Sequence, residues 1–328
     1  MRAVTISSFG GPDVLTISNV TDPVVADDSV GIQIEAAGIN RADLLQREGN
    51  YPPPAGEVEW PGLECAGIVT DVGAHVTDFR PGDRVMALLA GGGYAEKVAV
   101  PARQVMPVPD NLSFVEAAAI PEALATAWAN LVMAGKLTAG DTVLIAGGSG
   151  GVGSLAIQLA SNLSTTVLTT AGGEERVARC RELGADHAFD HRSVNVVDAV
   201  KEATDGHGVD VILDVLGGGA LNDNVRMLAA GGRVVIIGTQ QGRHGELDVF
   251  RLMSRRGSIT GTTLRSRPSE EKGQIIAEAS ACTLPWYESG KMRPVIHETF
   301  PMENAADAHR ALDSGEVFGK VILTNTGN

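Results

Sequence analysis

Residues 143–153 read VLIAGGSGGVG, and residues 154–160 continue as SLAIQLA. A short apolar strand therefore leads into a glycine cluster, and the cluster leads into an amphipathic helix. Three glycines keep a G-x-x-G-x-x-G spacing, which allows a tight turn whose backbone amides approach a pyrophosphate at a helix N-terminus. No Lys-Ser/Thr pair follows, which excludes the phosphate loop of nucleotide hydrolases. A glycine-rich turn without a ligand is the alternative. We predict a dinucleotide-binding turn, with cofactor contacts from Gly147, Gly148, Gly150, Gly151, Val152 and Gly153.

The chain around this turn alternates apolar strands with amphipathic helices. An Ala-rich helix at 123–134 comes first, after a capping box formed by Ser113 and Glu116. Alternation of strand and helix at this spacing is typical of a parallel sheet with right-handed crossovers. The strands of this sheet are expected at 142–146, 165–169, 209–213 and 233–237.

The two ends of the chain follow a different pattern. The N-terminal third is β-rich, with short apolar runs separated by Gly, Pro and Asp turns, which predicts a small antiparallel barrel or sandwich. After residue 264 we expect a helix near 270–284, a strand at 295–300, a helix at 303–313 and a last strand at 320–323. A length of 328 residues fits two domains.

Composition excludes several classes of function. The net charge of −14 repels phosphate backbones and anionic lipid, so we expect no nucleic-acid and no membrane partner. The uncharged run 142–173 is long enough to span a bilayer, but its seven glycines and changing periodicity indicate strand, helix and strand. No signal-peptide pattern follows Met1, and three distant cysteines do not suit a disulfide scaffold. A cytoplasmic protein is expected.

The choice of dinucleotide depends on the end of the strand after the glycine turn. An NAD site usually places a carboxylate there, whereas this strand ends in Thr170, Ala171, Gly172 and Gly173. Small neutral residues leave room for a 2′-phosphate, which favours NADP as the cofactor. Glu174 and Glu175 either repel that phosphate or simply begin the next helix, where acids suit the dipole. The candidate cofactor contacts here are Thr170, Gly172, Gly173 and Arg176, or His191 with Arg192 in place of Arg176.

The chain as a whole resembles the zinc-free, zeta-crystallin-like quinone oxidoreductase branch of the medium-chain dehydrogenase/reductase superfamily. The resemblance rests on GINRAD at 38–43, PGLECAGIV at 61–69, PGDRV at 81–85, the glycine turn, VIIG at 235–238 and FGKV at 318–321. It implies an α/β protein with a GroES-like β-barrel catalytic domain and a Rossmann doubly wound parallel-sheet nucleotide-binding domain. The first would comprise residues 1–121 completed by 265–328 and the second residues 122–264, with the active site in the cleft.

The resemblance also bears on metal binding. Zinc-dependent relatives take three protein ligands at places that are occupied here by Asn40, Leu63 and Glu122. Leucine cannot donate and asparagine is a poor ligand, while catalytic zinc needs three donors and an open position. An unusual site built from Glu64, Cys65 and Glu122 is the alternative. We therefore expect no metal.

The same resemblance implies roles for single residues. Asn40 and Tyr51 would contact substrate and Asp43 would orient them, although Asn40 could simply satisfy a turn and Tyr51 could be a packed loop aromatic. On the cofactor side, Lys320 would reach a phosphate, or else it would be a solvated surface charge. The histidines other than His191 are expected on the protein surface. The remaining cofactor contacts would be Thr126 near the nicotinamide, Gly238 at its carboxamide, and Arg267, with Arg265, at the adenosine end or the cleft rim.

Loss of zinc limits the reaction. Oxidation of an unactivated alcohol needs a Lewis acid, whereas quinones and conjugated carbonyls accept hydride without one. The resemblance therefore implies an NADPH-dependent quinone oxidoreductase that reduces a quinone or conjugated carbonyl. An enoyl or alkenal double-bond reductase, or a weakly catalytic NADPH-binding protein, is the alternative. A homodimer joined through an edge strand at 257–262 is expected.

Overall fold

The computed structural model describes residues 1–325 and separates into two compact units. Unit 1 contains Met1–Ala125 and Leu264–Asn328, and unit 2 contains Thr126–Thr263. The first boundary lies four residues later than expected (125 against 121), and the second lies one residue earlier (263 against 264). The chain thus leaves unit 1 once, forms unit 2, and returns.

Unit 1 is built on a seven-stranded sheet that the C-terminal chain completes. Its strand order is β14-β15-β3-β4-β5-β7, and β6 also pairs with β3. The last strand pairs antiparallel with β3, so that Ile322 lies opposite Gly38, and this joins the two ends of the sequence in one barrel-like sheet. A separate hairpin comprises β1 (Arg2–Ile6) and β2 (Leu15–Asn19). The sheet strands are β3 (Ser29–Gly38), β4 (Glu64–Val72), β5 (Arg84–Leu88), β6 (Lys97–Pro101), β7 (Val105–Pro107), β14 (Ile296–Pro301) and β15 (Lys320–Thr324).

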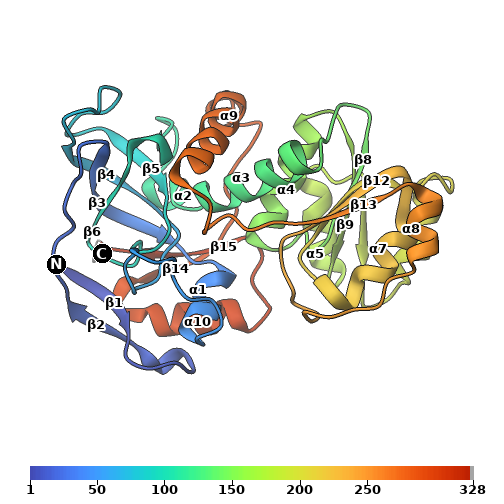
Figure 1. The fold of residues 1–328 in the computed structure, drawn as a ribbon, viewed down its shortest axis with the longest axis horizontal. Helices are drawn as coiled ribbons and strands as arrows, with labels where there is room; N and C mark the ends of the chain where they lie inside the picture. Colours follow the sequence, from blue (N-terminus) through green and yellow to red (C-terminus); the bar gives the residue numbers. More distant parts are fainter. Residues whose placement is uncertain (326–328) are drawn as a thin grey trace. The chain divides into compact units, whose positions relative to one another are not determined.

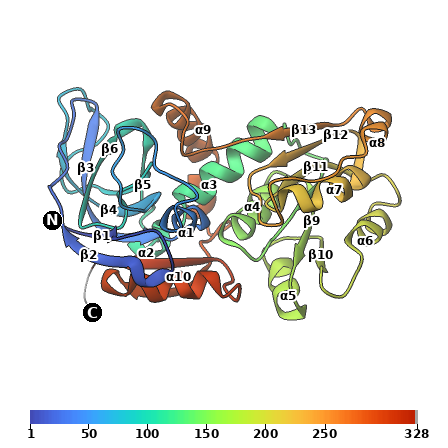
Figure 2. The same ribbon diagram turned by 60° about the horizontal axis from the view of Figure 1, so that its bottom comes forward.

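Helices close the ends of this sheet. Helix α10 (Ala305–Asp313) packs on β14 and β15. It also contacts α1 (Arg41–Arg47), which is labelled near it in Figure 2. Helix α9 (Ser269–Glu288) packs against β7 and the turn before it. Helix α2 (Phe114–Ala117) begins with the predicted capping box, in which Ser113 Oγ accepts from Glu116 N at 3.3 Å and the Glu116 carboxylate accepts from Ser113 N at 2.8 Å.

The Ala-rich helix covers the predicted range 123–134 and begins two residues earlier, at Pro121. Helix α3 (Pro121–Ala127) continues as a π-helical segment, Trp128–Ala134. Among the described residues, the continuous stretch Phe114–Ala134 passes a length and composition test for a membrane span. Its most apolar window is 78% buried, and a buried core helix passes the same test. The stretch is therefore weak evidence for a membrane.

Unit 2 contains a parallel sheet in the order β10-β9-β8-β11-β12-β13. Strands β8, β9, β12 and β13 of this sheet are labelled in Figure 1. The chain starts in the middle at β8, moves outward to β9 and β10, and then returns to the other side at β11. The strands are β8 (Thr142–Ile145), β9 (Thr166–Ala171), β10 (His187–Asp190), β11 (Val209–Asp214), β12 (Leu228–Ile236) and β13 (Ser258–Gly261). The helices are α4 (Gly151–Asn162), α5 (Glu174–Glu182), α6 (Val196–Ala203), α7 (Leu221–Met227) and α8 (Val249–Arg255).

This arrangement confirms the predicted Rossmann-type sheet. The reversal of strand order between β8 and β11 creates a topological switch point, where open α/β sheets bind ligands at the carboxyl ends of their strands. The uncharged run 142–173 forms a strand, a helix and a second strand, as expected. Strand β9 ends at Ala171, two residues beyond the predicted 169, and this extension brings Thr170 beside the glycine turn.

Candidate functional site

The glycine turn of unit 2 is tied to the neighbouring strand. Gly147 has φ +76°, in the left-handed region that favours glycine. Its backbone N–H donates to Thr170 Oγ1 at 3.2 Å, and the N–H of Gly148 donates to the Thr170 carbonyl at 2.9 Å. A Cβ at Gly153 would overlap the carbonyl oxygen of Gly147. The turn therefore requires glycine here because its backbone packs directly on itself.

The same turn exposes donors suited to an anion. Gly150 is the N-cap of α4, so the amides of Gly151, Val152 and Gly153 form the first turn of a twelve-residue helix. Such amides have no partner inside the helix and lie at the positive end of its dipole. A Cβ on Gly150 would meet only the Gly147 carbonyl oxygen, at 3.5 Å. The turn fits a pyrophosphate, which needs close approach to backbone amides.

Thr170, one of the predicted cofactor contacts, is bonded to the glycine turn. The sequence placed it among the cofactor contacts, but its side chain is buried and its hydroxyl accepts the Gly147 N–H. Thr170 therefore supports the shape of the turn. The signal that could have found this role is the register of β9, whose end must lie beside the end of β8 in a parallel sheet.

A basic side chain lies at the end of β9. A Cβ on Gly172 would fall 3.0 Å from Nε of Arg192, so the guanidinium of Arg192 lies over this glycine. Asp190 Oδ1 accepts from the backbone amides of Gly173 and Arg192, both at 3.0 Å, and these hydrogen bonds lower the pKa of the carboxyl. Arg176, or His191 with Arg192, was predicted as the cation at this strand end. In the structure Arg192 contacts the strand end, and Arg176 is half-buried on α5.

Gly238 and Thr126 are the other predicted cofactor contacts in unit 2. Gly238 follows β12 and lies against the carbonyl of Val215, to which a Cβ would come within 2.7 Å. It is therefore at the same carboxyl edge of the sheet as the glycine turn. Thr126 is buried, and its carbonyl accepts from Asn130 Nδ2 at 2.7 Å.

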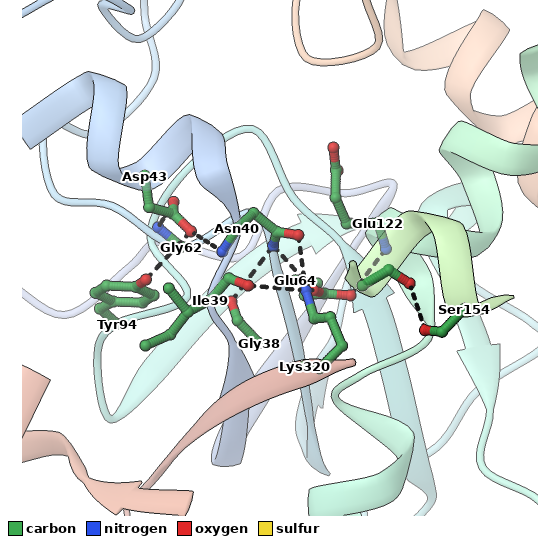
Figure 3. Close-up of polar contacts among 11 residues, drawn as sticks. Gly38, Ile39, Asn40, Asp43, Gly62, Glu64, Tyr94, Glu122, Ser154 and Lys320 are labelled. Carbon is green, nitrogen blue, oxygen red and sulfur yellow. Dashed lines mark hydrogen bonds and ion pairs between the residues drawn. The ribbon is translucent and has the colours of Figure 1, made fainter. Parts of the chain in front are cut away.

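Unit 1 contains a buried ion pair that the sequence did not reveal (Figure 3). Glu64, at the start of β4, is fully buried, and one carboxylate oxygen accepts from Lys320 Nζ and from Asn40 Nδ2 (2.9 Å). The other oxygen accepts from the backbone N–H of Glu122 at 2.9 Å. Lys320 Nζ also donates to the Ile39 carbonyl (3.0 Å) and to Asn40 Oδ1 (2.7 Å).

These contacts correct two expectations. Lys320 is neither a solvated surface charge nor free to reach a phosphate, because its ammonium is buried and donates to three protein oxygens. Both polar atoms of the Asn40 amide are engaged with Glu64 and Lys320, so the side chain is not a free substrate donor. The signal for the pair was an acid, Glu64, inside an apolar segment, since a buried carboxylate needs a counter-charge.

Asp43 is a fully buried connector. Its carboxylate accepts from Asn40 N (2.8 Å), Gly62 N (3.0 Å) and the Tyr94 hydroxyl (3.2 Å), which ties α1 to the chain before β4. Burial raises the pKa of Asp43 to about 6, although the hydrogen bonds from Asn40 and Gly62 oppose this shift. The geometry agrees with an orienting role and leaves no contact for substrate to share.

His309 corrects the expectation of surface histidines. It is fully buried, and its ring nitrogens lie 3.2 Å from the Tyr94 hydroxyl and 3.3 Å from Arg47 Nη1. Burial lowers the pKa of His309 to about 3, and the charge of Arg47 adds to the effect. The imidazole is therefore neutral near pH 7 and links α10 to α1.

Tyr51 is held by Arg265, which was predicted at the adenosine end of the cofactor or at the cleft rim. The guanidinium lies 5.4 Å from the centre of the Tyr51 ring and donates to the Tyr51 carbonyl at 3.3 Å. Arg265 is buried and also donates to the Ala90 carbonyl (2.6 Å) and Gln46 Oε1 (2.8 Å). Arg267 pairs with Glu271 at 3.5 Å. Tyr51 itself is half-buried, and burial raises the pKa of its phenol.

Glu122 lies beside the Glu64 carboxylate, to which its backbone N–H donates. It is half-buried, and burial raises the pKa of its carboxyl to about 8, helped by the negative charge of Glu64. Within residues 1–325, no group of three or more His, Cys, Asp or Glu side chains is placed to hold a metal ion. Leu63, at one of the positions that bind zinc in relatives, is buried in the core.

Comparisons with known proteins agree with this architecture. Residues 26–110 match the alcohol dehydrogenase GroES-like domain family and residues 151–281 match the zinc-binding dehydrogenase family. The chain is 37% identical to the quinone oxidoreductase of Sus scrofa and 35% identical to that of Homo sapiens, each over 98% of this chain and 97% of the relative. The solved quinone oxidoreductase of Escherichia coli, complexed with NADPH, superposes with a TM-score of 0.86 at 27% identity and covers 99% of this chain and 100% of its own. The chain belongs to the quinone oxidoreductase branch of the medium-chain dehydrogenase/reductase superfamily.

Proposed function

We propose that the protein is an NADPH-dependent quinone oxidoreductase. The observation that carries this proposal is the glycine turn of unit 2, whose helix amides fit a pyrophosphate, together with a strand end that has Arg192 in contact and Gly172 and Gly173 in place of an acid. The porcine and human relatives are quinone oxidoreductases, and the Escherichia coli enzyme binds NADPH. These three proteins support the same assignment.

Each part of unit 2 has a defined task toward the cofactor. The amides of Gly151, Val152 and Gly153 would hold the pyrophosphate, and the guanidinium of Arg192 would pair with the 2′-phosphate. Bound NADPH supplies a hydride, so that a quinone, the hydride and one proton from water give a hydroquinone and NADP⁺. Thr170 keeps the turn in the shape that presents these amides.

Tyr51 is the substrate donor that unit 1 leaves available. A tyrosine phenol is protonated at neutral pH, and burial raises the pKa of Tyr51 further, so its hydroxyl can donate a hydrogen bond to a quinone oxygen. Arg265 fixes the backbone of this residue, which reduces the conformational freedom lost on binding. Asn40 and Lys320 are committed to Glu64, so they hold the barrel interior and do not meet substrate.

The reaction is proposed to be metal-free. The three positions that carry zinc ligands in relatives hold Asn40, Leu63 and Glu122 here, and the Asn40 amide is already engaged by an ion pair. Such a set cannot provide the three donors that a catalytic zinc requires. A conjugated acceptor is electrophilic without a Lewis acid, which matches this donor set.

A steady-state assay tests the function. Purified protein should consume NADPH with 1,4-naphthoquinone and with 9,10-phenanthrenequinone, and the rate should be the same after treatment with EDTA. Crotonyl-CoA in parallel distinguishes an enoyl reductase, and tight NADPH binding without turnover on any acceptor would indicate a non-catalytic protein. Arg192→Ala should raise KM for NADPH and leave KM for NADH unchanged. Complete loss of activity with EDTA and its recovery with zinc would refute the metal-free reaction.

The assembly is proposed to be a homodimer. Strand β13 is the outer strand of the unit 2 sheet, and within residues 1–325 it pairs only with β12, which leaves its other edge without a strand partner. Helix α8 packs on β12 and exposes the side chains of Val249, Phe250 and Met253, of which Phe250 is 79% exposed. Unpaired edges and apolar patches of this kind mark association surfaces. Light scattering should give the mass of two chains, and Phe250→Asp should shift it toward one; a monomeric wild-type protein would refute the dimer.

A cytoplasmic location is proposed from the cysteines. Cys65, Cys180 and Cys282 are all free thiols. Free thiols are typical of a reducing compartment. The net charge of −14 further supports a protein without nucleic-acid or membrane partners, and a salt-dependent gel shift with RNA would contradict this. Fractionation of cells that express a tagged chain tests the location, and recovery in the secreted fraction would refute it.

A further inference from the structure

Tyr51 lies in an irregular segment, residues 49–60, that connects α1 to the chain before β4 and is called the Tyr51 loop here. The loop begins at Gly49, whose φ of +81° lies in the left-handed region that favours glycine. At its other end the Trp60 carbonyl accepts from the backbone N–H of Gly92 at 3.1 Å. Backbone contacts therefore fix both ends of the loop, and side chains must fix the part that carries Tyr51.

Arg265 attaches the first half of the Tyr51 loop to two other segments. Its Nη1 donates to the Tyr51 carbonyl at 3.3 Å, its Nε to the Ala90 carbonyl at 2.6 Å, and its Nη2 to Gln46 Oε1 at 2.8 Å. The side chain is only 3% exposed. Each guanidinium nitrogen thus has a neutral oxygen acceptor, and the planar fork of arginine holds the loop, α1 and the chain after β5 in one fixed geometry.

Gln46 extends this attachment to the second half of the loop. Its side chain is buried on α1, where Oε1 accepts from Arg265 and Nε2 donates to the Glu59 carbonyl at 2.7 Å. The two buried side chains therefore form one hydrogen-bonded pair that holds carbonyls in both halves of the loop, at Tyr51 and at Glu59.

The second half of the Tyr51 loop also rests on the backbone of Gly91 and Gly92, which follow β5. A Cβ on Gly91 would lie 3.3 Å from the Val58 carbonyl oxygen and 3.5 Å from Arg265 Nη2. Gly92 has φ +92°, and a Cβ there would lie 3.2 Å from Cγ2 of Val58. Because no side chain separates these glycines from Val58, the loop is supported there by backbone.

Arg265 contacts the ring of Tyr51 as well as its backbone. The guanidinium carbon lies over the ring at 5.4 Å from its centre, which is an attractive cation–π arrangement. Burial raises the pKa of the Tyr51 phenol and the charge of Glu122 adds to this, whereas the positive charge of Arg265 opposes it. The same guanidinium therefore sets the position of the ring and strengthens its hydroxyl as a donor.

We infer that Arg265, together with Gln46, is a positioning residue of the reaction: the pair holds the Tyr51 loop in the conformation that presents the Tyr51 hydroxyl to the electron acceptor. All three guanidinium nitrogens are used within the protein, so Arg265 acts through Tyr51 and not by contact with substrate or cofactor. The effect on catalysis rests on the proposed quinone reductase function. The attachment of the loop does not depend on turnover.

Hydrogen–deuterium exchange of the cofactor-free full chain tests the attachment. Arg265→Lys keeps the charge, but one ammonium cannot serve three acceptors in the geometry of the fork, so the amides of residues 49–60 should exchange about 10- to 100-fold faster. Gln46→Met should cause a smaller change in the same direction, because the bond from Arg265 to Tyr51 remains. Equal exchange of the loop in wild type and Arg265→Lys would overturn the inference.

Arg233→Lys is the matched control for these variants. Arg233 lies in unit 2 and also donates to backbone carbonyls, those of Gly135 (2.8 Å) and Lys136 (2.9 Å). This variant should leave exchange in the Tyr51 loop as in wild type. Faster exchange of the loop in Arg233→Lys would show a general loosening of the chain and would remove the support from the result with Arg265→Lys.

A spectroscopic titration reports on Tyr51 alone. The chain has three tyrosines, and Tyr94 and Tyr287 are each 1% exposed, so tetranitromethane should nitrate Tyr51 selectively. The nitrated phenol titrates near neutral pH with a change in visible absorbance. Its pKa should be higher in Arg265→Met than in wild type, because the positive charge over the ring is lost. An identical pKa in both proteins would contradict the contact between the guanidinium and the ring.

Kinetics test the effect on catalysis. Arg265→Lys should lower kcat/KM for 9,10-phenanthrenequinone by about 10- to 100-fold, with an unchanged Kd for NADPH in a fluorescence titration. In a Tyr51→Phe background, which lacks the hydroxyl, the same substitution should cost less than about 2-fold. Full additivity of the two substitutions, or weaker NADPH binding with normal quinone kinetics, would overturn the positioning role. Faster loop exchange in Arg265→Lys, in a protein that reduces no quinone, would refute the proposed function and leave the attachment of the loop standing.

Discussion

Replacement of Lys320 by methionine should destabilise the protein strongly, because it leaves the Glu64 carboxylate charged inside the barrel. Glu64 has no exposed surface, and Lys320 is 4% exposed. Loss of one partner of a buried ion pair typically costs about 3–5 kcal/mol. Glu64 would keep its hydrogen bonds from Asn40 Nδ2 and the backbone N–H of Glu122, so we expect the lower end, about 3 kcal/mol. For a domain of this size that corresponds to roughly 6–12 °C in unfolding temperature.

A double-mutant cycle measures the pairing directly. Glu64→Gln alone leaves the Lys320 ammonium without its counter-charge, whereas Glu64→Gln with Lys320→Met leaves two neutral groups. The double variant should therefore lose less unfolding free energy in urea than the sum of the two single variants. Arg41→Met is the control, since its ion pair with Asp313 at 2.9 Å is about half exposed and should contribute under about 1 kcal/mol. A loss below 1 kcal/mol for Lys320→Met, or strict additivity, would refute the reasoning.

Three further predictions concern the cofactor turn and Glu122. Gly153→Ala places a Cβ on the Gly147 carbonyl and should abolish NADPH binding in a fluorescence titration. The control is Gly261→Ala, where a Cβ meets nothing within 4 Å, and this variant should bind NADPH normally. Equal NADPH affinities of the two variants would contradict the packing argument. Thr170→Val removes the acceptor of the Gly147 N–H and should weaken NADPH binding by about 2- to 10-fold, with recovery in Thr170→Ser. The pKa of Glu122 is raised to about 8 in the folded protein, so the folded state binds this proton more tightly and the wild type loses stability as pH rises from about 4.5 to 8. Glu122→Gln should lose less over that range in melting experiments, and parallel curves would show that Glu122 does not titrate there.

The features predicted well from the sequence are those formed by residues that are close together along the chain. The glycine turn lies in one continuous segment, where strand, turn and helix follow each other within residues 143–160, and the strands of unit 2 came from their apolar periodicity. The capping box at Ser113 was recognisable for the same reason, since its two partners are three residues apart.

The features missed depend on which distant residues share the interior. Glu64 and Lys320 are 256 residues apart and meet because β15 adds to β3, next to β4. His309 is buried because α10 packs on the sheet and reaches α1, which its polar composition does not indicate. Arg265 likewise resembled a surface cation. Only the tertiary structure shows that its guanidinium lies over the Tyr51 ring and donates hydrogen bonds to the Ala90 carbonyl and the Gln46 amide oxygen.

The most direct test of the central claim is a single-turnover experiment. Protein loaded with one equivalent of NADPH, in the presence of EDTA, is mixed rapidly with 9,10-phenanthrenequinone while the absorbance of the reduced nicotinamide is followed. We expect one hydroquinone to form for each NADPH consumed, and deuterium at the transferred position of the nicotinamide to slow the reaction. Bound NADPH that stays reduced in the presence of the quinone, or that reacts only after zinc is added, would contradict the assignment of this chain as a metal-free quinone reductase.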